Sequence, residues 1–467
     1  MPRGQRRAER LHPTQRPVRK SSRWWVLYSL LLAAGALLNA CAPEQAQTPP
    51  PTGHYEGTLT CRGAELRVTF DLRELHGDTL QADLRVPTAQ GLGWQYPIVQ
   101  VVGTQLKAAS VHGPRLDVRH ESNFFRGTVY FGDTLQANLL VLRRGEAPKP
   151  LYQARPLPLP TAVGTAAATL LVPTDTLLHP AVVLLHGSGT PHQQDLYAYA
   201  DLLARNGFVA LVYDRRDARQ RGPAAYSQTD LAEDALAAVR VLKAQPRVDS
   251  ARVGLWGISQ GATVAALAAG QPSKPVAFVV GVSGPGVSWG AAARYQNQGF
   301  LRQAGVSPAE MRQALRAFDA VEQFVRRGRP SDSVRAATVL AEAWQQPWAS
   351  HTTLPKQLPT AAERKTLLQW RDLDLDPRQA WQRVPVPALL LYGAADDRFN
   401  ARETAQRLRS SVGRRRGSAV KLYPNADHEI MLGGAPADST QRWQWPQPAP
   451  GYLEDMLGWL KQQTAQQ

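Results

Sequence analysis

The sequence predicts a doubly wound, mostly parallel α/β sheet that carries a helical insertion and is preceded by a small antiparallel β domain. Three observations lead to this prediction. Apolar and polar residues alternate between about residues 54 and 144, short continuous apolar runs alternate with helical segments from about residue 165, and helical patterns dominate between 285 and 384. The 467 residues leave room for two domains, and 43% hydrophobic with 20% charged residues exclude a collagen-like, coiled-coil or wholly disordered chain.

The net charge of +16 is unevenly distributed. Residues 1–40 hold eight Lys and Arg residues against one acid, Glu9, and the remaining sequence is only mildly basic. It lacks the interleaved basic and aromatic residues that are typical of a nucleic-acid groove. We therefore expect no nucleic-acid partner.

The first 40 residues have the layout of a secretory signal peptide. After the basic stretch, residues 24–40 form an uncharged apolar run that ends directly before Cys41. The tetrapeptide LNAC that ends at Cys41 resembles the lipobox of bacterial lipoproteins, in which the cysteine becomes the acylated first residue. The alternative is a transmembrane anchor, but 17 residues are fewer than the roughly 20 that span a bilayer.

These features predict where the mature protein resides. We expect a signal peptide over 1–40, lipidation of Cys41 and a Pro-rich tether over 41–53. The lipid would anchor the protein to a membrane of the bacterial cell envelope, on the periplasmic or the surface side. Because Cys41 is then acylated, Cys61 has no disulfide partner, and a structural zinc site of cysteines is excluded.

Residues 54–147 predict the antiparallel β domain. Leu66, Val68, Phe70 and Leu72 alternate with polar residues, which is typical of half-buried strands. The hexapeptide GDTLQA occurs at both 77–82 and 132–137, each time before an alternating run, so each copy is expected to open the return strand of a hairpin. A Pro-rich linker over 148–164 follows.

Residues 165–465 predict the α/β domain, because short continuous apolar runs suit parallel strands that are buried on both faces. The expected strands are Ala181–Leu185, Phe208–Tyr213, Val253–Trp256, Ala277–Val282, Ala388–Tyr392 and Ala419–Tyr423. The expected crossover helices are Leu196–Asn206, Leu231–Ala244 and Ala262–Gly270. A helical cap insertion over 286–384 should contain helices at Pro308–Arg327, Ser333–Gln346 and Thr360–Arg371.

Ser259 is the candidate nucleophile. It lies in the pentapeptide GISQG at 257–261, which fits G-x-S-x-G and stands between a predicted strand and an Ala-rich helix. A serine at such a sharp turn takes a strained backbone conformation, which requires the flanking glycines and exposes the hydroxyl above the sheet edge. The alternative is a Gly-rich turn with an incidental serine.

Two backbone N–H groups are candidates for stabilising an oxyanion. The sequence HGSG at 186–189 directly follows a predicted strand, and its small residues let the N–H of Ser188 face a reacting carbonyl oxygen. The N–H of Gln260, directly after the serine, would be the second donor. The alternative for HGSG is a strand-end turn.

Catalysis by Ser259 would also need a base and a carboxylate, because a serine hydroxyl is a weak nucleophile without them. His428 follows a late strand, and Asp396 and Asp397 follow the strand before it. The order Ser259, Asp396, His428 would form a triad, and only one of the two adjacent carboxylates can reach the imidazole. His186 is the rival base, but it lies in another loop.

Residues from about 156 to 461 resemble a serine α/β-hydrolase of the group that includes dienelactone-hydrolase-like and serine-aminopeptidase-like esterases. The matching segments are HGSG (186–189), YDRR (213–216), GISQG (257–261), LDPRQAW (375–381), PALLLYGAADDRF (387–399) and YPNADH (423–428). The resemblance selects Asp396 as the triad acid, so that Asp397 would face solvent or cap the following helix. This chain departs from its relatives after YDRR, where it reads DARQR instead of a Gly-rich loop.

The expected activity is cleavage of small-molecule carboxylic esters through an acyl-enzyme, with no metal or organic cofactor. The alternatives are a peptidase or amidase with the same triad, and a non-catalytic envelope-binding protein on a hydrolase fold. Trp344 and Trp348 of the insertion would either shape the substrate pocket or form the insertion's core, and core is the favoured interpretation. Because the β domain supplies no member of the triad, the α/β domain alone is expected to be active.

Overall fold

The computed structural model describes residues 51–465, apart from 76–78, 110–112, 134, 190, 217–225, 274, 374 and 435–442. The predicted signal peptide, Cys41 and almost all of the tether lie outside these residues, as does the segment that departs from the relatives after YDRR. Within the described part of the chain, no helix is both long enough and apolar enough to cross a membrane.

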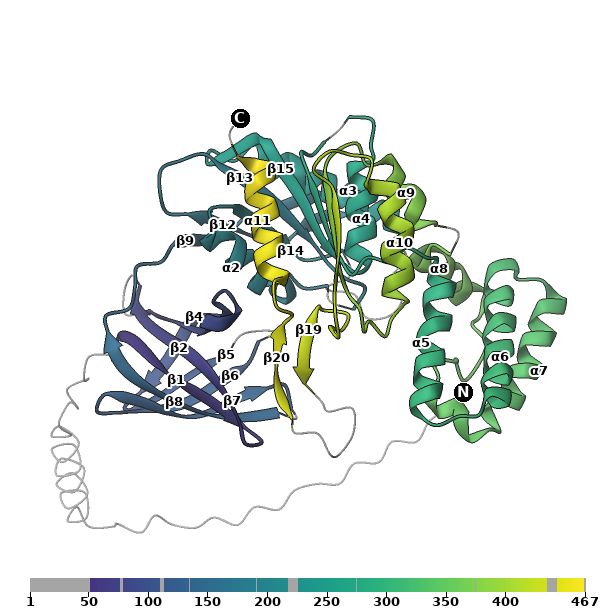
Figure 1. Ribbon diagram of the computed structural model, residues 1–467, viewed down its shortest axis with the longest axis horizontal. Helices are drawn as coiled ribbons and strands as arrows, with labels where there is room; N and C mark the ends of the chain where they lie inside the picture. The colour runs from purple at the N-terminus through teal and green to yellow at the C-terminus, as the bar shows by residue number, and fades with distance from the viewer. Residues whose placement is uncertain are drawn as a thin grey trace, which may run out of the picture. The chain divides into compact units, whose positions relative to one another are not determined.

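The N-terminal domain is a closed barrel of eight antiparallel strands in chain order (Figure 1). The sequence predicted antiparallel strands but not their closure, which pairs β1 with β8. Closure removes the two sheet edges that would otherwise expose unpaired backbone groups. The strands are β1 (Gly53–Cys61), β2 (Ala64–Glu74), β3 (Leu80–Val86), β4 (Leu92–Val102), β5 (Gln105–Ala109), β6 (Arg115–Glu121), β7 (Phe124–Phe131) and β8 (Leu135–Gly145).

Side chains fill the barrel. The alternating residues of β2 are buried, and Tyr55, Phe70 and Phe125 form an aromatic centre with ring centroids 4.9 to 6.2 Å apart. Cys61 is a buried free thiol. Each GDTLQA copy ends within a return strand, β3 or β8. Because β2 pairs with β3 and β7 with β8, the two predicted hairpins are confirmed.

The second domain is built on an eight-stranded sheet in the order β18-β17-β16-β15-β13-β14-β12-β9. The six strands from β18 to β14 are parallel, as predicted, and β12 and β9 add two antiparallel strands that the sequence did not predict. The strands are β9 (Tyr152–Pro156), β12 (Ala168–Pro173), β13 (His179–Leu185), β14 (Val209–Tyr213), β15 (Val248–Ile258), β16 (Val279–Val282), β17 (Ala388–Gly393) and β18 (Ala419–Tyr423). A short hairpin, β10 (Leu159–Thr161) and β11 (Gly164–Ala166), lies between β9 and β12 in the chain.

Helices cover both faces of this sheet, so its parallel strands are apolar throughout. One face packs against α3 (Gln228–Lys243), α4 (Gln260–Ala269), α9 (Pro377–Arg383) and α10 (Ala401–Val412). The other packs against α2 (Tyr197–Arg205) and the C-terminal α11 (Tyr452–Thr464). A 3₁₀ turn, η2 (Gln193–Leu196), leads into α2, and another, η1 (Pro87–Ala89), lies between β3 and β4.

The segment between β16 and β17 is helical. It contains α5 (Trp289–Gln303), α6 (Pro308–Arg327), α7 (Pro330–Trp344), η3 (Pro347–His351) and α8 (Ala361–Arg371), followed by α9. These helices share their own hydrophobic core, in which Trp348 is 2% exposed and Trp344 is packed against the buried residues. The two tryptophans are therefore core residues of the insertion, as favoured from the sequence.

A buried ionic contact joins the barrel to the α/β domain. Arg85 of β3 donates two hydrogen bonds to Asp201 of α2, at 2.7 and 2.9 Å. Asp201 also accepts from the Tyr152 hydroxyl at 2.7 Å and from Arg205 at 3.1 Å. These donors compensate for the loss of hydration at the buried carboxylate.

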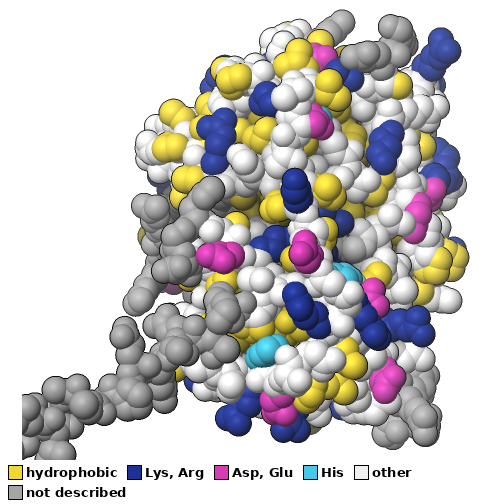
Figure 2. All heavy atoms as spheres, turned by 90° about the vertical axis from the view of Figure 1, so that its left-hand side faces the viewer, with side chains coloured by type: hydrophobic (Ala, Val, Ile, Leu, Met, Phe, Trp, Pro, Cys, Tyr) yellow, Lys and Arg dark blue, Asp and Glu magenta, His cyan; other side chains and the backbone are white. Residues whose placement is uncertain are grey.

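The surface charge is mixed on the face seen in Figure 2. There, Lys and Arg side chains are scattered among Asp and Glu side chains, and the described residues on this face form no continuous basic stripe.

Candidate active site

Ser259 lies between β15 and α4, where the chain turns sharply from strand to helix. Its φ of 54° and ψ of −121° are strained for a residue with a side chain, and a bond from its N–H to the Val282 carbonyl at 2.8 Å helps to hold them. The turn requires both flanking glycines. A Cβ at Gly257 would lie 2.2 Å from the Gly261 carbonyl oxygen, and a Cβ at Gly261 would lie 2.3 Å from that of Leu185.

Asp396 and His428 are brought together from two neighbouring strand ends. The imidazole Nδ1 donates to Asp396 Oδ2 at 2.8 Å, and the backbone N–H of Arg398 donates to Oδ1 at 2.7 Å. The carboxylate is completely buried. With Nδ1–H bound in this way, Nε2 of the neutral imidazole is the nitrogen that can accept a proton. Among the described residues, the Ser259 hydroxyl makes no hydrogen bond, and such contacts are often long in unliganded sites.

Asp397 points away from this pair. Its side chain is 54% exposed and lies 3.3 Å from Arg398 Nε. The cap of α10 is Asn400, whose side chain accepts from the Glu403 N–H at 3.2 Å. The sequence left open whether Asp397 faces solvent or caps the following helix, and in the structure it faces solvent.

Arg215, buried after β14, organises the loop that contains Ser188. Its guanidinium donates to the Gly187 carbonyl, and also to the Ser188 carbonyl at 3.0 Å. Because a trans peptide directs its C=O and N–H to opposite sides, binding the Gly187 carbonyl turns the Ser188 N–H away from Arg215. The same guanidinium lies 3.5 Å from the Gln260 side-chain oxygen.

Gln260 is the first residue of α4, so its backbone N–H has no acceptor within the helix. Arg215 thus contacts both residues whose N–H groups the sequence singled out. Arg215 lies in the YDRR segment, but no local pattern in the sequence indicates this role.

His186, the rival base, is committed to a structural contact. Its Nε2–H donates to the Tyr213 carbonyl at 2.7 Å, which ties the end of β13 to the end of β14. Burial lowers the pKa of His186 to about 4, so the ring is neutral near pH 7. The unprotonated nitrogen, Nδ1, is buried and is therefore not accessible to a substrate.

The model of the α/β hydrolase family matches residues 182–440, more than half of the chain. The chain belongs to the α/β hydrolase family. No curated protein matches it in sequence. The match to the family model confirms the resemblance to α/β hydrolases that the sequence motifs indicated.

Several solved structures are similar to this hydrolase. A dienelactone hydrolase from Anabaena variabilis shares 14% identity over 66% of this chain and 94% of that chain, with a TM-score of 0.36. The α/β hydrolase GrgF from a Penicillium species shares 18% identity over 67% of this chain and 100% of that chain, with a TM-score of 0.42. The carboxylesterase EstE1, cloned from a metagenomic library, shares 18% identity over 60% of this chain and 82% of that chain, with a TM-score of 0.36.

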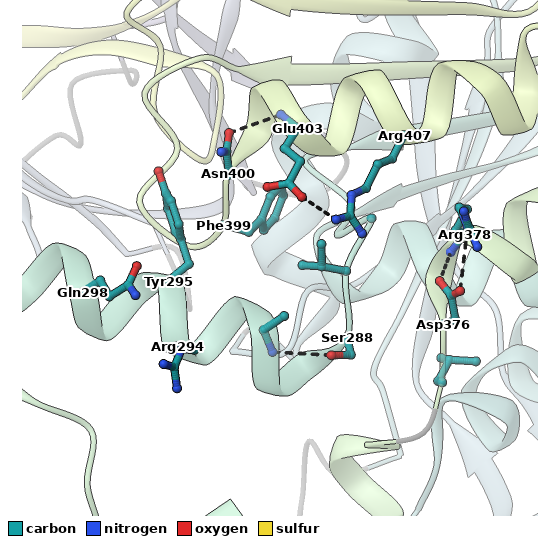
Figure 3. A pocket seen from close by; sticks show the side chains of 14 residues that line it. Ser288, Arg294, Tyr295, Gln298, Asp376, Arg378, Phe399, Asn400, Glu403 and Arg407 are labelled. Atoms are coloured by element: carbon teal, nitrogen blue, oxygen red, sulfur yellow. Dashed lines mark hydrogen bonds and ion pairs between the residues drawn. The ribbon is translucent and has the colours of Figure 1, made fainter. Parts of the chain in front are cut away.

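A cavity of about 580 Å³ in this hydrolase lies beside α10, and none of the three candidate triad residues lines it. Phe399 lines it and also packs against the His428 ring, with centroids 5.8 Å apart. Figure 3 shows α5 along one side and α10 along the other, with the side chains of Tyr295, Phe399 and Glu403 between them. The insertion therefore contributes α5 to this cavity, while Trp344 and Trp348 lie in the hydrophobic core of the insertion.

The cavity walls combine polar and apolar surface in similar amounts. Four of the five charged lining residues form opposite pairs, Glu403 with Arg407 at 2.5 Å and Asp376 with Arg378 at 3.8 Å. The charged lining residues are Arg294, Asp376, Arg378, Glu403 and Arg407. Within the described residues, no group of three or more His, Cys, Asp or Glu side chains could hold a metal ion.

Proposed function

We propose that this hydrolase cleaves carboxylic esters through an acyl-enzyme, with Ser259 as nucleophile, His428 as base and Asp396 as the orienting carboxylate. The hydrogen bond between Asp396 and His428 is the observation that carries the proposal. It is accompanied by a strained, glycine-flanked serine at the strand-to-helix turn. Two such features in one member of this family fit nucleophilic catalysis better than a structural role.

In the proposed reaction, Ser259 Oγ attacks the ester carbonyl carbon while His428 Nε2 takes the hydroxyl proton. The carbonyl π electrons move to oxygen, and the N–H groups of Ser188 and Gln260 stabilise that oxyanion. When the tetrahedral intermediate collapses, the alcohol leaves with the proton from His428. Water then attacks the acyl-enzyme by the same route and releases the acid.

Arg215 would act by positioning the oxyanion donors. It binds the carbonyls of Gly187 and Ser188 and approaches the Gln260 side chain. Preorganised donors of this kind stabilise an oxyanion more than mobile donors do, because they need not reorient as the charge develops.

We infer that the acyl group enters the cavity beside Phe399, whose five charged side chains favour small, hydrophilic esters. A long acyl chain placed there would remove water from five charged side chains without offering them hydrogen bonds. A hydroxylated or otherwise polar group can instead donate to the carboxylates and accept from the guanidiniums. We therefore infer that activity falls as the acyl chain lengthens.

The test is a panel of p-nitrophenyl esters of increasing acyl length, together with peptide anilides, on the purified protein. Wild type should hydrolyse short esters best and react with a fluorophosphonate probe, and Ser259→Ala should do neither. Faster cleavage of the anilides would favour the peptidase or amidase alternative. Absence of both turnover and labelling in a folded wild-type protein would favour the non-catalytic envelope-binding alternative and refute the proposal.

We also propose that acylation of Cys41 anchors the protein to a membrane of the bacterial cell envelope. The support is the basic stretch, the apolar run and the lipobox-like LNAC segment. In a host that processes bacterial lipoproteins, wild type should incorporate radiolabelled palmitate and partition into detergent, whereas Cys41→Ala should not. Label on the variant would refute the assignment of Cys41.

A further inference from the structure

We propose that the β-barrel positions the catalytic histidine through one contact, made by Trp445. This inference rests on the proposed role of His428. The connection runs through a hairpin of β19 (Met431–Gly434) and β20 (Gln444–Pro448), which begins three residues after His428 (Figure 1).

The turn that contains His428 is closed by its neighbours. The Asp427 N–H donates to the Met431 carbonyl at 3.0 Å, and Asp427 Oδ1 accepts from the N–H groups of Glu429 and Met431 at 3.0 and 2.8 Å. Met431 is also the first residue of β19. The position of His428 therefore depends on where β19 starts.

Ile430, between His428 and β19, makes this dependence stronger. It is completely buried with φ at 58°, a conformation that a β-branched side chain adopts only when its surroundings impose it. Its carbonyl accepts from the Ala449 N–H at 2.9 Å, directly after β20 ends. Both strands of the hairpin thus hold the strained residue.

The hairpin has only four and five residues in its strands, and an isolated two-stranded hairpin is marginal in water. Trp445 of β20 anchors it to the barrel. The indole is 7% exposed within the barrel's hydrophobic cluster, and its Nε1–H donates to the Ala64 carbonyl of β2 at 3.1 Å. Its ring also lies 5.5 Å from that of Phe131 at the end of β7.

These contacts connect the barrel to the imidazole in one continuous series. Trp445 fixes β20, β20 pairs with β19 and bonds to Ile430, and Met431 closes the turn around His428. Trp445 is thus a positioning residue that touches neither substrate nor reacting atoms. The expectation that the α/β domain alone is active is reversed by this inference.

The experiment compares Trp445→Ala with Trp445→Phe and with Leu116→Ala in the full chain. Leu116→Ala removes a completely buried side chain from β6, which pairs with neither hairpin strand, so it controls for loss of barrel packing alone. Trp445→Ala should lower kcat about 10²-fold on a short ester with little change in KM, as a misplacement of about 1 Å can do. Trp445→Phe keeps an aromatic ring but loses the hydrogen bond from the indole N–H to the Ala64 carbonyl, and should retain more activity than Trp445→Ala.

Hydrogen exchange of the peptide over 427–432 provides a readout that does not depend on turnover. Trp445→Ala should accelerate exchange there, and Leu116→Ala should leave both exchange and kcat near the wild-type values at a temperature where it is folded. Unchanged exchange and kcat in Trp445→Ala, or equal losses in Leu116→Ala, would overturn the inference. If wild type itself were inactive, the proposed function would fail, and the exchange comparison would still decide whether Trp445 positions the turn.

Discussion

Two adjacent carboxylates offer a sharp test of the proposed mechanism, because the structure gives them opposite environments. Asp396 is fully buried and bound to His428 Nδ1, whereas Asp397 is 54% exposed beside Arg398. Replacing either carboxylate by Asn changes one atom and removes one charge. Any large difference between the two variants therefore reflects the environment of the carboxylate and not the chemistry of the substitution.

In Asp396→Asn, Oδ1 can still accept from the Arg398 N–H, so the loop should keep its shape. The new amide would face Nδ1 as a donor and favour the tautomer with the proton on Nε2, which can no longer accept the serine proton. The corresponding change in the best-studied serine protease costs about 10⁴ in kcat, or about 5.5 kcal/mol in the barrier. We expect a similar loss with a melting temperature close to that of wild type.

Asp397→Asn removes only an exposed ion pair, which is worth at most about 1 kcal/mol of stability. Its kcat should remain within about twofold of wild type. The assay is the initial rate on p-nitrophenyl acetate, with thermal unfolding of each variant to verify the fold. An inactive Asp397→Asn beside an active Asp396→Asn would move the acid by one residue, and two active variants would remove this loop from the mechanism.

Three further outcomes follow from buried groups. Because burial lowers the pKa of His186 to about 4, the unfolded chain takes up this proton at a higher pH than the folded chain. Between pH 6.5 and pH 5, the free energy of unfolding of wild type should fall by about 1.5 kcal/mol more than that of His186→Asn, and equal falls in chemical denaturation would contradict this. Asp201→Ala leaves buried Arg85 with only its longer contact to Asp83, at 3.4 Å, and should cost about 3–5 kcal/mol. The double variant with Arg85→Ala should cost less than the sum of the two single variants. Gly261→Ala places a Cβ 2.3 Å from a backbone oxygen and should abolish fluorophosphonate labelling, an effect that normal labelling of a folded variant would rule out.

Much of the fold could be predicted from the sequence because it depends on local patterns. Continuous apolar runs identified all six parallel strands of the α/β sheet, and alternation identified an antiparallel β domain without delimiting its eight strands. The candidate residues Ser259, Asp396 and His428 were identifiable because each stands in the loop or turn that follows such a strand. Parallel strands bring their carboxyl ends to one edge of the sheet.

Other features depend on contacts between distant segments, and only the tertiary structure decided them. Barrel closure pairs the first strand with the eighth, and no local pattern records that pairing. Arg215 reaches carbonyls 28 and 27 residues away. Trp445 donates a hydrogen bond to Ala64, which lies 381 residues away in the sequence. The sequence around Trp445 therefore does not indicate that its side chain belongs to the core of the barrel. Local periodicity determines which segments are strands and helices, whereas the burial of a given side chain against a distant partner depends on how those segments pack.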